Sequence, residues 1–207
     1  MNSLPDSLIA LLFPLDQGMK VSKRIRKIVL LHTTELSVLI HDQVDNDKLN
    51  KALGWFGKQL CTLHMTLDGV LQTNESIVWL KMNPSFACLT SFTMKDSVFS
   101  RNCGDDAAVE FGKLLPLASK LKRLSLANSN LDSRGMVAIC KGLVGNTCLK
   151  SLNVAHNKIE NPGANAIAAL IAHCVIEYID VSYNGITEGE LLSNIVHQTD
   201  SVCKLIL

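Results

Sequence analysis

Aliphatic residues return with the same spacing three times in the second half of the chain. Each block has aliphatic side chains at its first, fourth and sixth positions, and the blocks begin at residues 121, 149 and 176, which are 28 and then 27 residues apart. Because side chains alternate between the two faces of a strand, each block predicts a short strand with its aliphatic residues buried. Repetition at this period predicts that successive units stack side by side.

Each unit also contains a helical pattern after its strand. Small or aliphatic residues recur at every fourth position in two units, as Gly135, Ile139 and Leu143 and again as Gly163, Ile167 and Ile171. This spacing places them on one face of a helix. Pro162 suits the first turn of the second helix, where its missing amide hydrogen costs little.

The turn after each strand carries an asparagine or a substitute for it. Asn157 and Asn184 occupy this position in two units, and Ser129 occupies it in the unit before them. Asparagine side chains hydrogen-bond readily to backbone groups, so stacked asparagines would form an internal ladder. We expect that ladder to be weaker at Ser129.

Fainter copies of both patterns precede the clear units. Strands are predicted at residues 28–33, 60–65 and 89–94, and helices over 47–58, 74–82 and 105–115. We therefore predict a repeat domain over residues 28–207, degenerate over 28–120 and clear over 121–207. Residues 1–27 are predicted to form an N-terminal capping helix and a basic approach segment. The basic run at 20–27 is either a solvated approach to the first strand or a contact for acidic protein tails, nucleic acid or an anionic membrane surface.

The final block, residues 202–207, repeats the strand pattern, and no polar cap follows it. A terminal repeat without a cap exposes core residues and an open sheet edge. We therefore expect either a longer array, of which this chain is a part, or a partner or second copy that covers this strand.

The blocks that begin at Leu121, Leu149 and Ile176 resemble the ribonuclease-inhibitor type of leucine-rich repeat. The resemblance implies an α/β solenoid, a curved horseshoe with parallel strands on its concave face and helices on its convex face. Its members include ribonuclease inhibitor, the Ran GTPase-activating protein, tropomodulin-like actin-end binders and scaffold proteins of cilia. The implied function is a non-catalytic intracellular protein–protein interaction module or a scaffold subunit of a larger assembly, for example cytoskeletal or ciliary. The alternative is a regulatory protein resembling the Ran GTPase-activating protein.

The residues between the buried aliphatic positions are the candidate partner-binding site, because strand alternation turns them to the concave face. They are Lys122, Arg123, Ser125, Lys150, Ser151, Asn153, Glu177, Tyr178 and Asp180, with Asn128, His156 and Tyr183 just beyond the strands. Charges of both signs around tyrosines are typical of a surface that recognises a folded protein. Charged residues at exposed strand positions also serve solubility alone.

Composition narrows the partner and the compartment. The formal net charge is only +1, which gives no overall field to attract nucleic acid. The seven cysteines are scattered and include no C-x-x-C pair, as expected of reduced thiols in a cytosolic or nuclear protein. We expect a cytoplasmic location, and the resemblance adds association with the cytoskeleton or a cilium. The apolar run at residues 8–13 is too short to span a membrane.

Neither a catalytic nor a metal site is expected. The chain has no G-x-S-x-G, H-E-x-x-H or Gly-rich phosphate-binding motif, and we expect no cofactor and no small-molecule substrate. The adjacent His173 and Cys174 are the sharpest catalytic candidates, but neighbouring residues usually point apart and a buried thiol suits a repeat boundary. His32 and His64 are expected in one row of strand residues, without the third ligand that a metal site needs.

Overall fold

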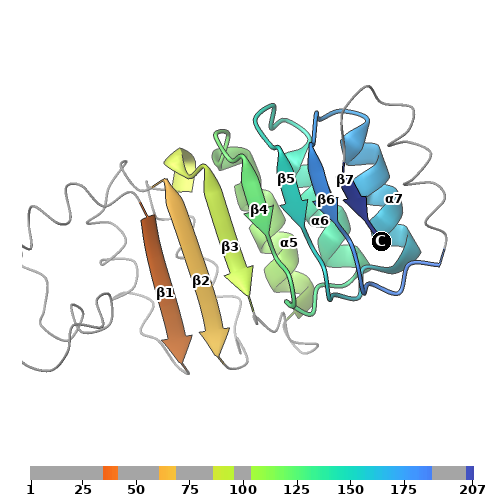
Figure 1. Cartoon of the computed structure of the whole chain (residues 1–207), viewed down its shortest axis with the longest axis horizontal. Coiled ribbons are helices and arrows are strands. Elements are labelled where there is room, and N and C mark those ends of the chain that lie inside the picture. Colours follow the sequence, from red (N-terminus) through yellow and green to blue (C-terminus); the bar gives the residue numbers. More distant parts are fainter. Residues whose placement is uncertain (1–34, 42–60, 69–85, 96–103, 188–203) are drawn as a thin grey trace, which may run out of the picture.

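The computed structural model describes residues 35–41, 61–68, 86–95, 104–187 and 204–207. Within them, seven strands pair in parallel and in chain order to form one sheet. The strands are β1 (Glu35–His41), β2 (Thr62–Asp68), β3 (Ser91–Lys95), β4 (Arg123–Ser125), β5 (Ser151–Asn153), β6 (Tyr178–Asp180) and β7 (Lys204–Ile206). Each strand from β2 to β6 therefore lies between the strands of the preceding and following units (Figure 1).

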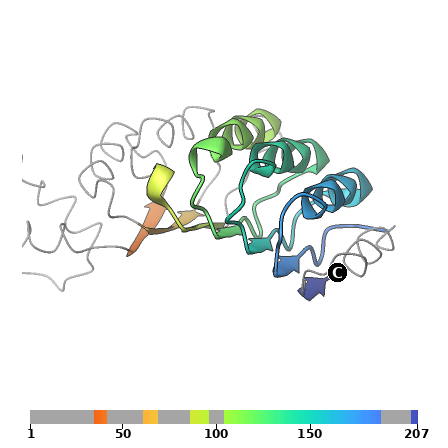
Figure 2. The same cartoon turned by 90° about the horizontal axis from the view of Figure 1, so that it is seen from above.

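Helices cover one face of this sheet. The described α-helices are α5 (Gly104–Leu114), α6 (Ser133–Leu143) and α7 (Glu160–Ile171), with short 3₁₀ turns η2 (Phe86–Cys88) and η3 (Leu115–Leu117). Seen from above, α5, α6 and α7 lie side by side on the same side of β4–β6 (Figure 2). We call the opposite face of the sheet the outer sheet face. The structure is thus an α/β repeat fold, with one strand and one helix in each of the units that begin at Leu121 and Leu149.

The register of the sheet places the predicted aliphatic positions side by side. Phe92, Leu124, Leu152 and Ile179 lie opposite one another on four neighbouring strands, and each is at most 1% exposed. Burial of one such side chain contributes about 2 kcal/mol relative to leaving it in water. The prediction that the three clear blocks form neighbouring parallel strands is confirmed.

The predicted position of the first strand was wrong. Leu36 of β1 pairs with Leu63 of β2, whereas the repeat pattern predicts residues 28–33 as the strand beside β2. The segment from Glu35 onward has apolar residues at alternating positions, which is the stronger strand signal. Consequently, Ser37 rather than His32 lies opposite His64. His32 itself is outside the described residues.

The other strands and helices predicted in the first half of the chain lie partly within the described residues. The helix predicted over 105–115 is confirmed as α5. The strands predicted at 60–65 and 89–94 overlap β2 and β3. The helices predicted over 47–58 and 74–82, and the capping helix and basic segment of residues 1–27, lie outside the described residues.

Close helix packing holds neighbouring units together. A Cβ atom at Gly142 of α6 would lie 2.0 Å from the carbonyl oxygen of Gly112 of α5, and a Cβ at Gly112 would lie 2.6 Å from the carbonyl oxygen of Ala138. These distances are far inside van der Waals contact, so only glycine permits this approach of the two backbones. Helix α6 begins at a conventional cap, where Asp132 Oδ1 accepts a 2.8 Å hydrogen bond from Gly135 N.

The predicted asparagine ladder is present beneath the loops that leave the strands. Asn157 Oδ1 accepts hydrogen bonds of 2.9 Å from the backbone N–H groups of Ser129 and Leu131, in the preceding unit. Its Nδ2 donates at 2.8 Å to the carbonyl oxygens of Leu126 and Val154. One buried amide therefore ties two successive loops together.

The ladder continues on both sides of Asn157. Asn184 Nδ2 donates to the carbonyl oxygens of Val154 and Val181, at 2.9 and 2.8 Å. Ser129 reaches back to the carbonyl oxygen of Met94 through a single hydroxyl, at 3.3 Å. This longer contact agrees with the expectation of a weaker ladder at Ser129.

A third buried amide, outside the ladder, was not anticipated from the sequence. Asn146, in the turn between α6 and β5, donates through Nδ2 to the carbonyl oxygens of Ala118 and Leu121 at 3.1 and 3.2 Å. Its Oδ1 accepts from the N–H groups of Cys148 and Leu149 at 2.7 and 2.9 Å. It fixes the opposite edge of the repeat. The sequence signal was an asparagine three residues before the first leucine of a strand block, but only one described unit carries it.

Candidate partner-binding surface

The candidate residues of β4, β5 and β6 form rows across the outer sheet face. One row contains Arg123, Ser151, Tyr178 and Lys204, and the next contains Ser125, Asn153, Asp180 and Ile206. Backbone hydrogen bonds from Lys150 N to Lys122 O (2.8 Å) and from Glu177 N to Lys150 O (2.9 Å) align these three residues in a further row. All the candidate strand residues are exposed or half-buried, while the leucine or isoleucine between them is buried. The structure therefore brings the predicted residues together on one face.

The acidic side chains of β6 already have partners. Glu177 pairs with Lys150, with Oε1 and Nζ 3.2 Å apart. Asp180 Oδ1 accepts hydrogen bonds from Ser182 N (3.1 Å) and Ser182 Oγ (2.7 Å), and its Oδ2 accepts one from the Tyr178 hydroxyl at 3.2 Å. Desolvation first, and then the charge and hydrogen bond of Asp180, raise the pKa of Tyr178 above its ordinary value. The Tyr178 hydroxyl therefore stays protonated and remains a donor at neutral pH.

The basic side chains of β4 are different. Lys122 and Arg123 are exposed, and neither forms an ion pair within the part of the chain that the structure describes. The predicted basic patch beside two carboxylates is thus present, but its charge is unevenly balanced. Lys150 is neutralised by Glu177, whereas no described carboxylate pairs with Lys122 or Arg123.

Three residues just beyond the strands have the same unusual backbone. Asn128, His156 and Tyr183 have φ values of 55°, 56° and 56°. Left-handed backbone costs a non-glycine residue about 1 kcal/mol or more. Hydrogen bonds from Asn128 N to Ala155 O and from His156 N to Ser182 O, both 2.9 Å, hold these loops in register.

This backbone conformation accompanies a stack between two of the candidate side chains. The rings of His156 and Tyr183 lie 4.3 Å apart between centroids, with 11° between their planes. Tyr183 is 76% exposed, the highest value among the large exposed hydrophobic side chains of the described chain. We call His156 and Tyr183 the aromatic shelf. The sequence placed both residues past their strands, but the contact depends on the 27-residue spacing and the register of β5 and β6.

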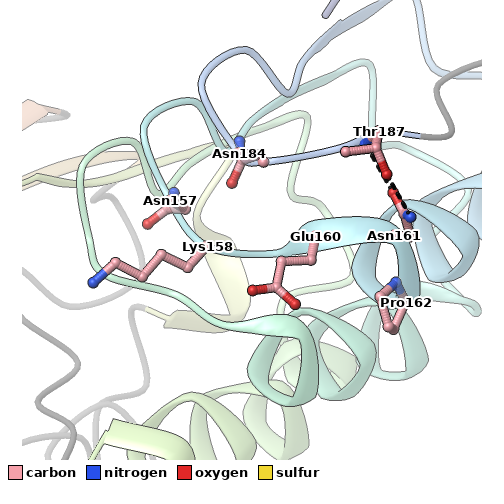
Figure 3. A pocket seen from close by; sticks show the side chains of 8 residues that line it. Asn157, Lys158, Glu160, Asn161, Pro162, Asn184 and Thr187 are labelled. Atoms are coloured by element: carbon pink, nitrogen blue, oxygen red, sulfur yellow. Dashed lines mark hydrogen bonds between the residues drawn. The ribbon is translucent and has the colours of Figure 1, made fainter.

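An open depression of about 360 Å³ lies at the loops before α7. It is lined by Asn157, Lys158, Glu160, Asn161, Pro162, Asn184, Gly185 and Thr187 (Figure 3). Asn161 Nδ2 donates to Thr187 Oγ1, and Thr187 N donates to Asn161 Oδ1, both at 2.9 Å. The side-chain amide of Asn161 therefore joins the start of α7 to the segment that follows β6. This structural role accounts for the polar groups that line the depression.

The catalytic candidates His173 and Cys174 have separate partners, as expected. His173 Nδ1 lies 2.8 Å from the carbonyl oxygen of Ala169 in α7, while Cys174 Sγ donates to the carbonyl oxygen of Asn146 at 3.4 Å. Burial raises the pKa of the Cys174 thiol, and burial together with Cys174 raises that of Cys140 to about 12. Thiols that remain protonated at neutral pH are poor nucleophiles and poor metal ligands.

The described ranges lack the features of a metal site and of a membrane-spanning helix. They contain no group of three His, Cys, Asp or Glu side chains that could hold a metal ion. Within the same ranges, no helix has the length and apolar character needed to cross a membrane.

Comparison with known families agrees with the geometry. Residues 118–140 and 145–168 each match the leucine-rich repeat family. The first segment contains β4 and most of α6, and the second contains β5 and most of α7. No curated protein matches the chain. Residues 118–168 therefore match two leucine-rich repeats, and domains of this family generally mediate protein–protein interaction and are typically not catalytic.

Proposed function

We propose that this protein is a non-catalytic interaction module, a scaffold subunit of a larger assembly, that binds a protein partner on its outer sheet face. We further propose that its repeats are of the ribonuclease-inhibitor type and curve so that this face is concave. The observation that carries the proposal is the aromatic shelf. Tyrosine is among the residues enriched at the centres of protein interfaces.

The shelf has the properties of a preorganised contact. Stacking on His156 fixes the ring of Tyr183, so little rotamer freedom remains to be lost when a partner binds. The left-handed backbone beneath both residues is retained although it costs free energy, and such positions concentrate at functional sites. The polar rows of β4–β6 continue from the shelf and provide the surrounding rim.

Site-specific photo-cross-linking in the native cell tests this proposal. Tyr183 is replaced by p-benzoylphenylalanine, which keeps an aromatic ring at this exposed position just beyond β6. The matched control places the same group at the exposed Lys141 of α6, on the helix side. We expect Tyr183 to cross-link to a defined protein and the Lys141 position not to do so.

Two results would overturn the proposal. Cross-links to that protein from Lys141 alone would move the binding site to the helices. A rise in GTP hydrolysis by candidate GTPases in the presence of the purified chain, without stable complex formation, would favour the regulatory alternative instead of a scaffold.

A further inference from the structure

The positive charge on β4 lacks a counter-charge on the neighbouring strands. Arg123 lies between Ser91 of β3 and Ser151 of β5 in its row. Lys122 lies between Thr90 and Lys150, because Lys122 N donates to Thr90 O and Lys150 N donates to Lys122 O, both at 2.8 Å. The neighbours of both cations are therefore small and neutral, or basic.

The nearest described carboxylates on this face are two strands away and already engaged. Parallel strands are spaced by about 4.8 Å, so β6 lies roughly 10 Å from β4, which is about one Debye length at physiological salt. Glu177 is held by Lys150, and Asp180 accepts three hydrogen bonds within β6 and its loop. Neither carboxylate screens Arg123 effectively.

We propose that the outer sheet face over β4 and β5 binds an acidic polypeptide segment, whose carboxylates pair with Arg123 and Lys122. This inference rests on the proposed function and specifies the chemistry of its partner. The guanidinium of Arg123 is able to hold a carboxylate through two parallel hydrogen bonds, and its small neighbours leave both edges of the group accessible. Lys122 supplies a second, less directional charge.

A polypeptide suits this face better than a nucleic acid. Glu177 and Asp180 lie on the same surface, and they would repel the evenly spaced phosphates of a strand that crossed β6. A peptide is able to place carboxylates over β4 and neutral or apolar residues beyond, toward the aromatic shelf. The overall charge of +1 likewise gives no field that would attract a polyanion as such.

Binding of a fluorescein-labelled octaglutamate peptide to the full chain tests the inference, with fluorescence anisotropy as the measurement. The loss variant is the double substitution Lys122→Glu and Arg123→Glu. Its matched control, Lys113→Glu with Lys141→Glu, changes the net charge equally on exposed helix positions. We expect the β4 pair to weaken binding by roughly tenfold or more, and the helix pair to change it by less than about twofold.

A gain variant excludes a folding defect as the cause. Glu177→Gln removes the counter-charge that occupies Lys150, so a third cation becomes available to the peptide. We expect affinity to rise by roughly two- to fivefold, and all binding to weaken between about 50 and 300 mM NaCl.

Three outcomes would overturn the inference. The first is octaglutamate binding no tighter than octalysine. The second is an equal loss in the β4 and helix pairs. The third is tighter binding of an eight-nucleotide oligothymidylate or of phosphatidylserine vesicles with the same dependence on Lys122 and Arg123. If cross-links from Tyr183 persist in any of these cases, the protein-binding function stands and only the acidic partner is refuted.

Discussion

Removal of the central rung of the asparagine ladder should destabilise the protein strongly. Asn157 is 7% exposed and its side chain makes five hydrogen bonds of 2.8 to 3.2 Å to backbone groups. The substitution Asn157→Ala removes all five without adding bulk. It tests whether buried amides, as well as stacked aliphatic rows, hold successive units together.

The structure sets the expected magnitude. Loss of Oδ1 leaves the N–H groups of Ser129 and Leu131 without their acceptor, and each orphaned buried donor costs about 1 to 3 kcal/mol. Loss of Nδ2 is less costly, because the carbonyl oxygen of Val154 keeps a second donor from Asn184 at 2.9 Å. The free energy of unfolding should therefore fall by about 3 to 5 kcal/mol, a large share of the stability of a typical domain.

Urea unfolding followed by far-UV circular dichroism measures this change, and Asn153→Ala is the matched control. Asn153 lies on the outer sheet face, half-buried, and accepts one 3.0 Å hydrogen bond from Ala155 N. Water replaces that bond easily, so we expect a cost of about 1 kcal/mol or less. The Asn157 variant should unfold at a urea concentration lower by about 1 M or more.

Losses of stability that agree to within about 0.5 kcal/mol in the two alanine variants would refute this role of Asn157. That result would mean that water or relaxed loops satisfy the groups that Asn157 leaves. Ser129→Ala gives an independent check, because it removes one hydroxyl with contacts of 3.3 Å and should cost less than Asn157→Ala.

Three further predictions concern packing, titration and a surface ion pair. Gly142→Ala should destabilise by about 3 kcal/mol or more, because its Cβ would meet a backbone oxygen of α5 at 2.0 Å, whereas Gly145→Ala, with nothing within 4 Å, should be nearly neutral; equal thermal midpoints would contradict this. The Cys140 thiol keeps its proton in the folded state up to a pKa of about 12, against 9.0 ordinarily. The unfolded chain loses that proton at a lower pH than the folded protein. The stability that the protonated thiol contributes is therefore complete below pH 9 and falls by about 1.4 kcal/mol per pH unit as the pH rises toward 12. Urea unfolding at about pH 9 and pH 10.5 should show a smaller loss of stability between the two pH values in Cys140→Ala than in the unsubstituted protein. Equal losses in the two proteins would refute the raised pKa of Cys140 as the cause. Lys150→Ala should change stability by less than about 1 kcal/mol, because the pair with Glu177 is solvent-exposed; a larger loss in urea unfolding would show that the pair is structurally important.

The sequence by itself determined the repeating frame of the protein. Residues 121–181 specify their strands because a buried row needs an aliphatic side chain at each crossing, and Leu124, Leu152 and Ile179 supply it at nearly constant spacing. The helix stripe and the buried Asn157 follow from equally local rules. The strand prediction at residues 28–33 was wrong, because a degenerate repeat pattern fits more than one position. The alternation of apolar residues that begins at Leu36 was the stronger strand signal.

Only the tertiary structure decided which side chains meet across the units. Three features depend on strand register: the stack of His156 on Tyr183, the pairing of Lys150 with Glu177, and the position of Arg123 away from every described carboxylate. Register is set by the lengths of the connecting segments and by the burial of the aliphatic rows, neither of which depends on the outward-facing residues. The buried pattern therefore encodes the scaffold, while the contacts on the outer sheet face emerge only when the units are stacked.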